Sequence, residues 1–466
     1  NPVTSEMITT GNEIPDAIAD DDVYYNRKTK GTITRALRNF HNLFVKRILI
    51  TSAAKRGGTL IDMSVGKGGD FPKWIASKLS FVFGLDVARD NIENRLDGAC
   101  ARFLSYKKQY RSMPYALFVT ANSGLNIRST EACATDKGKE ITRAVFGEGP
   151  RDEKKLGKGV IRQYGKGEDG FDVVSNQFSI HYFFENTEML NNFLRNVSEC
   201  CKVGGYFIGT SYDGREVFRQ LENKNIGESI FINKNGVKMW EIKKQYDQDE
   251  FPNNMSSIGY KIDVYQESIN KTFSEYLVNY EYLIQLIENY GFILVERDEA
   301  RSMGLPNSIG NFDQLYYEMQ QQIKTKKIKK ADLFSAPDMS ADEKKISFLN
   351  KYFVFKKIRD VNAEEVSRVM MNESKQQLDD EKEEEMKIQK ELIKKAGPTV
   401  KKIKKKIKIK TKSKLKIKES KEKSTETPPV EPTIAPAPGT EAKQSKKSKK
   451  PKRKLKIKLK IKKDSN

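Results

Sequence analysis

The stretch TLIDMSVGKGGD, residues 59–70, decides the fold of this chain. An apolar run ends in Asp62 and passes into a glycine-rich turn, and a second apolar run, FVFGL, ends in another acid, Asp86. This pattern predicts a strand, a tight turn, a helix and a second strand. In an open α/β sheet such a unit places a glycine-lined crevice and a ribose-binding carboxylate at the strand ends. The sequence therefore predicts a site for a nucleoside-containing cofactor.

The glycine spacing indicates which cofactor fits. A dinucleotide fingerprint requires a third glycine where Phe71 stands, and the phosphate loop Gly-x-x-x-x-Gly-Lys-Ser/Thr is absent from the chain. A loop of the form Gly-x-Gly-Gly after an acid suits S-adenosylmethionine, which has no phosphates and needs room for its amino acid half. The alternative is a glycine turn that only packs a helix on a sheet.

The charge of the chain is concentrated at its C-terminal end. Residues 398–466 contain 26 lysines and arginines against 6 acidic residues, a net charge of +20. The remaining 59 basic and 57 acidic residues leave a net charge of +2 on residues 1–397. Adjacent like charges repel, so we expect a disordered lysine-rich tail that binds RNA or another polyanion.

Cysteine, histidine and hydropathy patterns argue against several classes of protein. The four cysteines lack Cys-x-x-Cys spacing, and the only histidines are His41 and His181, so we expect no metal site and reduced cysteines in an intracellular protein. No apolar run approaches the roughly 18 residues of a membrane span, so we expect no membrane partner.

Composition divides the chain into four parts. Residues 1–22 are expected to be an acidic linker cut from a longer polypeptide, because the chain begins with Asn rather than Met. Residues 23–359 are expected to form one α/β domain with a mostly parallel sheet and helices on both faces, interrupted by a mobile insertion at 133–170. A charged helical segment at 360–397 and the tail at 398–466 follow.

Periodicity predicts the individual elements. Apolar residues at helical spacing predict an amphipathic helix over residues 33–50, and 91–106 is also expected to be helical. Strands are predicted at 59–61, 81–86, 115–120, 171–175, 204–210, 292–295 and 351–357.

Four segments together resemble the messenger RNA cap guanine-N(7) methyltransferases. They are LRNFHN at 37–42 with Lys46, the stretch 62–74, QFSIHY at 177–182 and GGYFIGT at 204–210, and the resemblance extends over roughly residues 24–359. It implies a Rossmann-like S-adenosylmethionine-dependent methyltransferase fold.

Within that family the chain is most similar to the last domain of the multifunctional capping enzymes of large DNA viruses. That likeness implies triphosphatase and guanylyltransferase domains upstream, since the guanylyltransferase motif Lys-x-Asp-Gly is absent here. It also implies a location in the virion or a cytoplasmic viral factory, or in the nucleus for a cellular protein.

The resemblance assigns roles to specific positions. The S-adenosylmethionine site would be lined by Lys46, Asp62, Ser64, Gly66, Asp86, Asn122, Gln177 and Tyr182. The cap would be faced by Asn42, Lys67, Lys73, Arg102, Phe178, His181, Glu275 and Tyr352.

The chain departs from the family pattern at several of these positions. Ser64 replaces the usual first loop glycine, Val65 the usual cysteine and Asn122 the adenine-side aspartate, so we expect altered cofactor contacts. The spacing between Asn42 and Lys46 is offset by a residue from the cellular pattern.

The chemistry of the implied reaction needs no general base. Nitrogen-7 of guanine is a neutral lone pair, and its methylation removes no proton, so holding it in line with the sulfonium methyl group and excluding water suffices. We therefore expect no catalytic residue in the acid–base sense. Two alternatives stay open: a methyltransferase for another substrate, and a nucleic-acid-binding subunit with an inert methyltransferase fold.

Overall fold

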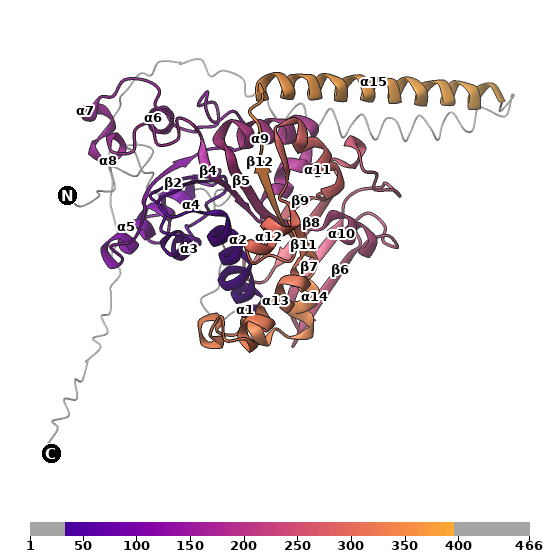
Figure 1. Ribbon diagram of the computed structural model, residues 1–466. Coiled ribbons are helices and arrows are strands. Elements are labelled where there is room, and N and C mark those ends of the chain that lie inside the picture. Colours follow the sequence, from indigo (N-terminus) through magenta and orange to yellow (C-terminus); the bar gives the residue numbers. More distant parts are fainter. Residues whose placement is uncertain (1–32, 396–466) are drawn as a thin grey trace, which may run out of the picture. The chain divides into compact units, whose positions relative to one another are not determined.

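The structure, a computed structural model, describes residues 33–395 (Figure 1). The linker and the tail predicted at 1–22 and 398–466 lie outside these residues. The chain divides into two units at residues 383 and 384. The first unit holds every described strand, and helix α15 (Ala363–Lys395) ends beyond the division.

The main sheet of the first unit has the strand order β10-β12-β5-β4-β1-β2-β3, with β11 paired to β12. The pairs among β1 to β5 are all parallel, and the pairs made by β12 are antiparallel. The strands are β1 (Thr59–Asp62), β2 (Phe81–Asp86), β3 (Tyr115–Thr120), β4 (Phe171–Gln177), β5 (Cys201–Tyr212), β10 (Phe292–Leu294), β11 (Ile309–Asn311) and β12 (Asn350–Lys357).

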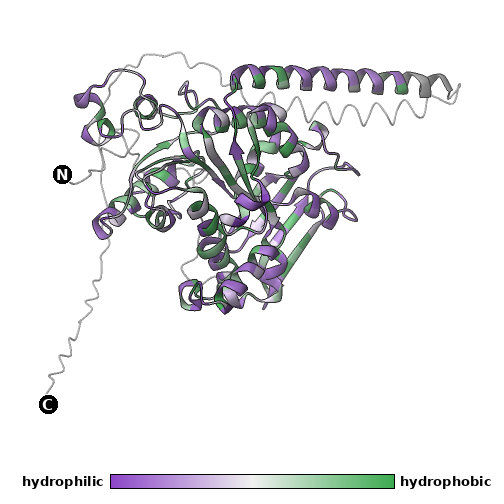
Figure 2. Cartoon of the chain, in the orientation of Figure 1, coloured by the Kyte–Doolittle hydropathy of each residue, from purple (hydrophilic) through white to green (hydrophobic). Residues whose placement is uncertain are grey.

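Alternate residues of each central strand point to opposite faces, and both faces are covered. Leu60 and Val82 belong to one core cluster, whereas Ile61 and Phe83 belong to the other. Figure 2 shows the central strands in hydrophobic colours, as expected for strands that are buried on both faces. The predicted fold class, a mostly parallel sheet with helices on both faces, is confirmed.

The first of these core clusters contains side chains of α2, α3 and α5, and the second contains side chains of α6, α9 and α11. The α-helices besides α15 are α1 (Arg35–Asn39), α2 (Lys46–Ala53), α3 (Phe71–Ala76), α4 (Arg89–Glu93), α5 (Ala99–Gln109), α6 (Asp136–Val145), α7 (Glu153–Leu156), α8 (Lys158–Ile161), α9 (Thr187–Cys200), α10 (Gly214–Gln220), α11 (Tyr280–Asn289), α12 (Arg297–Ser302), α13 (Phe312–Lys324) and α14 (Ala341–Ser347). Short helical turns are η4 (Ile180–Glu185), η5 (Met255–Ser257), η6 (Lys330–Leu333) and η7 (Ala336–Asp338).

A second sheet, which the sequence does not predict, is inserted between β5 and β10. It is antiparallel in the order β6-β7-β8-β9, and its strands are β6 (Ser229–Lys234), β7 (Val237–Lys244), β8 (Lys261–Gln266) and β9 (Lys271–Tyr276). Glu275 lies on β9 opposite Ile262. The second sheet therefore supplies a residue that the resemblance assigns to the cap.

Two sequence predictions need correction, one about a helix and one about a mobile insertion. The helix predicted over 91–106 is interrupted, because Asn94 leaves the helical conformation and its side chain accepts hydrogen bonds from the backbone of Leu96 and Asp97. The segment 133–170, predicted as a mobile insertion, contains α6, α7 and α8. Buried side chains from this segment, including Ile141 and Val160, join the core.

The helix predicted over 33–50 is present but changes its winding. Between α1 and α2, residues 40–45 form the π-helical turn η3 (Phe40–Val45). A π-turn accommodates an extra residue within a continuous helix. The turn contains Asn42 and ends just before Lys46, the two residues whose spacing the sequence analysis finds offset by one.

Helix α15 covers the range in which the sequence predicts a charged helical segment. Figure 2 shows it as largely hydrophilic. Near its start, Val366 and Met370 pack against the second core cluster, so this end of the helix is anchored in the first unit.

Candidate active site

The carboxyl ends of the parallel strands gather the predicted cofactor residues at one edge of the main sheet. Asp62 ends β1, Asp86 ends β2 and Gln177 ends β4, while Asn122 follows β3. Ligands of open α/β sheets bind outside this edge, where the strand order reverses. Here the strand order reverses between β1 and β4. The glycine loop follows β1, and Gln177 is the last residue of β4.

The glycine loop is tied to the second strand through Asp86. Its Oδ2 accepts a hydrogen bond of 2.8 Å from the amide of Gly66, which has φ of +54°. Its Oδ1 accepts from the amide of Ala88 at 3.0 Å and from Asn91 Nδ2 at 2.9 Å. Burial raises the pKa of Asp86, and these three donors oppose that effect. The carboxylate is thus held rigidly at the rim of the loop.

A side chain at Gly68 is excluded by its surroundings. Gly68 has φ of +71°, and a Cβ atom there would lie 2.2 Å from the ring of Phe71. Phe71 is the residue that replaces the third glycine of the dinucleotide pattern. The loop is therefore packed closely against the first residue of its own helix.

Two lysines contact one buried carboxylate, that of Asp70, at the end of this loop. Lys46 Nζ lies 2.7 Å from Asp70 Oδ2, and Lys73 Nζ lies 2.9 Å from Asp70 Oδ1. Burial raises the pKa of Asp70, but the two ammonium groups outweigh it and hold the pKa at about 2. Burial, with the negative charge of Asp70, raises the pKa of nearby Asp62 to about 7. A cationic amino group bound beside Asp62 would favour its charged form.

The remaining predicted cofactor residues border the same edge. Asn122 Oδ1 accepts from the amide of Gly124 at 2.9 Å, which orients the side-chain amide. Gln177 Oε1 accepts from Thr210 Oγ1 at 3.3 Å. The ring of Tyr182 lies 4.3 Å from that of His181, so the last of the cofactor residues adjoins the cap residues.

Basic side chains predicted to face the cap are held by acids or by backbone. Lys67 Nζ lies 2.7 Å from Asp90 and 2.8 Å from Asp97. Burial lowers the pKa of Lys67, but these acids raise it overall, which keeps the lysine charged. Arg102 donates to the carbonyl of Lys67 and lies over the ring of Phe71. The structure therefore brings Lys67 and Arg102 together at the loop.

His181, on the helical turn η4, and Glu275, on β9 of the second sheet, form a buried polar pair. His181 Nε2 lies 3.6 Å from Glu275 Oε2, and both side chains are less than a tenth exposed. Burial lowers the pKa of His181 to about 3 and raises that of Glu275 to about 8, so the contact is between neutral groups near pH 7. Within the described residues, neither ring nitrogen of His181 nor Glu275 Oε2 has a hydrogen-bond partner. Buried polar atoms without partners are costly, and they indicate a binding site.

Phe178 is held in an unusual conformation against a histidine that the sequence analysis did not select. Its φ is +60°, and its ring stacks on His41 with 5.1 Å between ring centroids. His41 Nε2 lies 2.8 Å from Ser347 Oγ, which fixes the imidazole. Strained backbone of this kind is typical of functional sites. His41 could have been found from its place in the LRNFHN segment.

Asn42 and Tyr352 each donate a side-chain hydrogen bond to a backbone carbonyl. Asn42 Nδ2 donates to the carbonyl of Arg38 on its own helix at 3.0 Å. Tyr352 is fully buried, and its hydroxyl donates to the carbonyl of Asn307 at 2.9 Å. Their roles at the cap stay predictions.

The donor set suits a nucleoside sulfonium compound. Asp86 offers acceptor oxygens for ribose hydroxyl groups, Asp62 an acid for an amino group, and Asn122 and Gln177 amides for polar edges. Among residues 33–395, no three His, Cys, Asp or Glu side chains form a group able to hold a metal ion. In the same part of the chain, no helix has the length and hydropathy needed to cross a membrane.

The fold and this edge of polar side chains define a Rossmann-like methyltransferase. Residues 19–358 match the family model described as the mRNA (guanine-N(7))-methyltransferase domain. The chain belongs to this family.

The chain is similar to a viral and a fungal protein. The chain is 27% identical over 411 residues to a probable mRNA-capping enzyme of Acanthamoeba polyphaga mimivirus, a match that covers 81% of this chain and 33% of the relative. It is 30% identical over 300 residues to the mRNA cap guanine-N(7) methyltransferase of Candida glabrata, covering 63% of this chain and 62% of the relative. The chain thus spans about a third of the viral relative and three fifths of the fungal one.

Solved structures with a similar fold include an S-adenosylmethionine-dependent methyltransferase from Clostridium acetobutylicum. It has 12% identity and a TM-score of 0.34, and the match covers 57% of this chain and 85% of that one. The CcbJ methyltransferase from Streptomyces caelestis has 12% identity and a TM-score of 0.35. That match covers 76% of this chain and 99% of the CcbJ chain.

Proposed function

We propose that this chain transfers a methyl group from S-adenosylmethionine to nitrogen-7 of the guanine cap of GpppRNA. The observation that carries the proposal is the pair His181 and Glu275 beside the predicted cofactor residues. Both ring nitrogens of His181 and Oε2 of Glu275 are buried without a hydrogen-bond partner in the described part of the chain. The family to which the chain belongs supports it.

The residues at the strand ends would hold the cofactor. Asp86, already fixed by Gly66, would accept from the ribose hydroxyl groups, and Asn122 would border the adenine. When bound, S-adenosylmethionine supplies an electrophilic methyl group on a sulfonium. The chain supplies position and a dry surrounding, and no described residue is required to take a proton from the neutral nitrogen.

Glu275 would recognise the Watson–Crick edge of the guanine. In its ionised form, its two oxygens accept together from the ring N–H and the exocyclic amine. His181 would then find a partner in the base or its ribose. Phe178, stacked on His41, would border the purine.

Radiolabel transfer from S-adenosylmethionine to GpppRNA tests the function. The expected product releases labelled 7-methylguanosine on digestion. Label on another atom, or transfer to free small nucleophiles but not to capped RNA, would favour a methyltransferase for another substrate. Binding of RNA without any transfer would favour an inert, nucleic-acid-binding fold.

The proposal extends to partners. The net charge of +20 on residues 398–466 suits a tether for nascent RNA, because many lysines release many counterions from phosphates. Upstream triphosphatase and guanylyltransferase domains in the same polypeptide are also proposed, since the matched viral relative is a probable mRNA-capping enzyme of greater length. We also propose a location in a virion or a viral factory.

A further inference from the structure

The loop that follows β3 is fixed from behind by one buried side chain of α9. Asn196 is fully buried, and its Nδ2 donates to the carbonyls of Ser123 and Leu125 at 2.8 Å and 2.6 Å. Its Oδ1 accepts from the amide of Ile127 at 2.9 Å. The side-chain amide of Asn196 therefore makes all of these hydrogen bonds, two donated and one accepted, with the backbone of this single loop.

The same loop carries Asn122, which the proposed function places beside the adenine. The backbone of Asn122 accepts from the amide of Leu125 at 3.0 Å, so the residue joins the turn that Asn196 holds. Ser123 Oγ in turn donates to the carbonyl of Met63, just before the glycine loop, at 2.8 Å. The loop thus connects α9 with the floor of the cofactor site.

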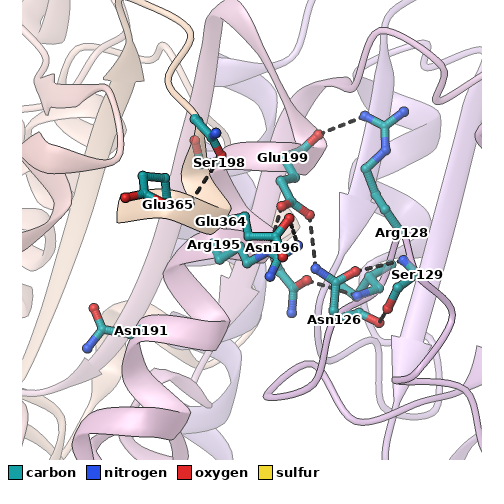
Figure 3. Close-up of polar contacts among 12 residues, drawn as sticks. Asn126, Arg128, Ser129, Asn191, Arg195, Asn196, Ser198, Glu199, Glu364 and Glu365 are labelled. Atoms are coloured by element: carbon teal, nitrogen blue, oxygen red, sulfur yellow. Dashed lines mark hydrogen bonds and ion pairs between the residues drawn. The ribbon is translucent and has the colours of Figure 1, made fainter. Parts of the chain in front are cut away.

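A second anchor holds the far end of the loop to the same helix. Asn126 Nδ2 donates to Glu199 Oε2, and Arg128 Nη1 donates to the carbonyl of Glu199, both at 3.2 Å. Figure 3 shows Asn126, Arg128 and Ser129 grouped against this end of α9, while Asn191 lies apart from the group. Residues from two successive turns of α9, Asn196 and Glu199, therefore hydrogen-bond the same loop.

We propose that Asn196 is a positioning residue for adenine recognition. It rests on the proposed function, and it acts through the loop rather than by touching the ligand. Without Asn196, the buried carbonyl of Ser123, the part-buried carbonyl of Leu125 and the amide of Ile127 lose their partners, and the loop relaxes to satisfy them. Asn122 then no longer presents its amide at a fixed place, so the site loses both affinity for the cofactor and preference for adenine.

The test compares two homocysteine ligands in the full chain. S-inosylhomocysteine carries hypoxanthine in place of the adenine of S-adenosylhomocysteine, so the ratio of their dissociation constants reports recognition of the base alone. For Asn196→Ala we expect the Kd of S-adenosylhomocysteine to rise about tenfold and the ratio to fall toward one. The KM for the cap should stay near that of the wild type.

Asn191→Ala is the matched control. Asn191 is 1% exposed on the same helix, and it bonds Tyr290 and the carbonyl of Thr187 rather than the loop. The Asn191→Ala protein should lose about as much stability as Asn196→Ala. It should keep the wild-type ratio of the dissociation constants of the two homocysteine ligands. Should Asn196→Ala fail to fold, Asn126→Ala removes the half-buried second anchor, and a shift of the ratio in the same direction is expected.

The outcomes separate this inference from the proposed function. A wild type that binds neither homocysteine contradicts the function itself. A wild type that prefers adenine, together with folded Asn196→Ala and Asn126→Ala proteins that keep that preference and affinity, overturns the positioning role alone. So would an Asn191→Ala protein that lost the preference equally.

Discussion

Ser179 donates a hydrogen bond of 2.5 Å to Ser64 across the site. Ser64 follows β1 and stands where the family usually has glycine, whereas Ser179 lies between Phe178 and His181 on the cap side. The amide of Ser64 also donates to Asp62 Oδ1 at 3.2 Å. The side chain that replaces glycine therefore links the cofactor loop to the cap segment.

Removing this link should weaken cofactor binding modestly and non-additively. A neutral hydrogen bond contributes about 0.5–1.5 kcal/mol, so Ser179→Ala should raise the Kd of S-adenosylhomocysteine about two- to tenfold. In a Ser64→Ala background, the second change should add little, because the bond is already lost. Ser198→Ala serves as the control, since its hydroxyl is buried but donates to the carbonyl of Tyr290. Additive effects of the two site mutations in calorimetry would show that the hydroxyl groups act separately.

Asp86→Ala should abolish methyl transfer mainly through the cofactor. Losing a charged acceptor for a ribose hydroxyl pair costs about 1.5–3 kcal/mol, or roughly ten- to a hundredfold in affinity. Asp172→Ala is a matched control, because Asp172 also accepts from a backbone amide, that of Thr59, but at the start of β4. It should lower stability and leave the Kd unchanged. An unchanged Kd in folded Asp86→Ala would remove Asp86 from the site.

The buried acid Glu275 should make the free protein less stable as pH rises. Burial raises its pKa from 4.5 to about 8 in the folded state. Between these values the unfolded chain has released the proton and the folded chain retains it, so rising pH favours unfolding. The free energy of unfolding of the wild type, relative to Glu275→Gln, should therefore fall across this range. Urea titrations at both ends of the range measure it, and a constant difference would contradict the raised pKa.

Cap binding near neutral pH should release a proton from the same residue. Glu275 is neutral in the free protein near pH 7, and accepting from two guanine donors requires the ionised form. Calorimetry with GpppG in two buffers of different ionisation enthalpy should give different apparent enthalpies for the wild type. Glu275→Gln should remove most of that difference. Equal enthalpies for the wild type would show that the guanine edge is read by another group.

Sequence reasoning located the parallel sheet because strand, turn and acid recur at short range around Asp62 and Asp86. It missed the antiparallel sheet at 229–276, whose strands are partly exposed and carry weaker apolar runs. Glu275 on that sheet came from the resemblance, and only the fold shows its contact with His181. The π-turn at 40–45 was also missed, because winding depends on tertiary packing rather than on periodicity. The role of Asn196 could not be predicted from the sequence, because it depends on the hydrogen bonds that its buried amide makes to a loop about 70 residues away in the chain.

The tail prediction concerns residues 398–466, which lie outside the described part of the chain. We propose that they tether RNA near the site without taking part in methyl transfer. Their net charge of +20 stands against +2 on the rest of the chain. A chain truncated after Gly397 should keep its turnover on GpppG, because this short ligand needs only the folded site. Loss of that turnover would mean that the tail belongs to the catalytic domain.

The same truncation should change how long capped RNA responds to salt. Lysines that neutralise phosphates release counterions, so the affinity of the full chain should fall steeply with salt concentration and depend little on base sequence. The truncated chain should show a higher KM for long capped RNA and a flatter salt dependence, while its KM for GpppG stays the same. The measurement is KM for both substrates over a series of salt concentrations. Equal salt slopes for the two proteins on long RNA would rule out the tether, since a tail that contacts phosphates must contribute to the slope.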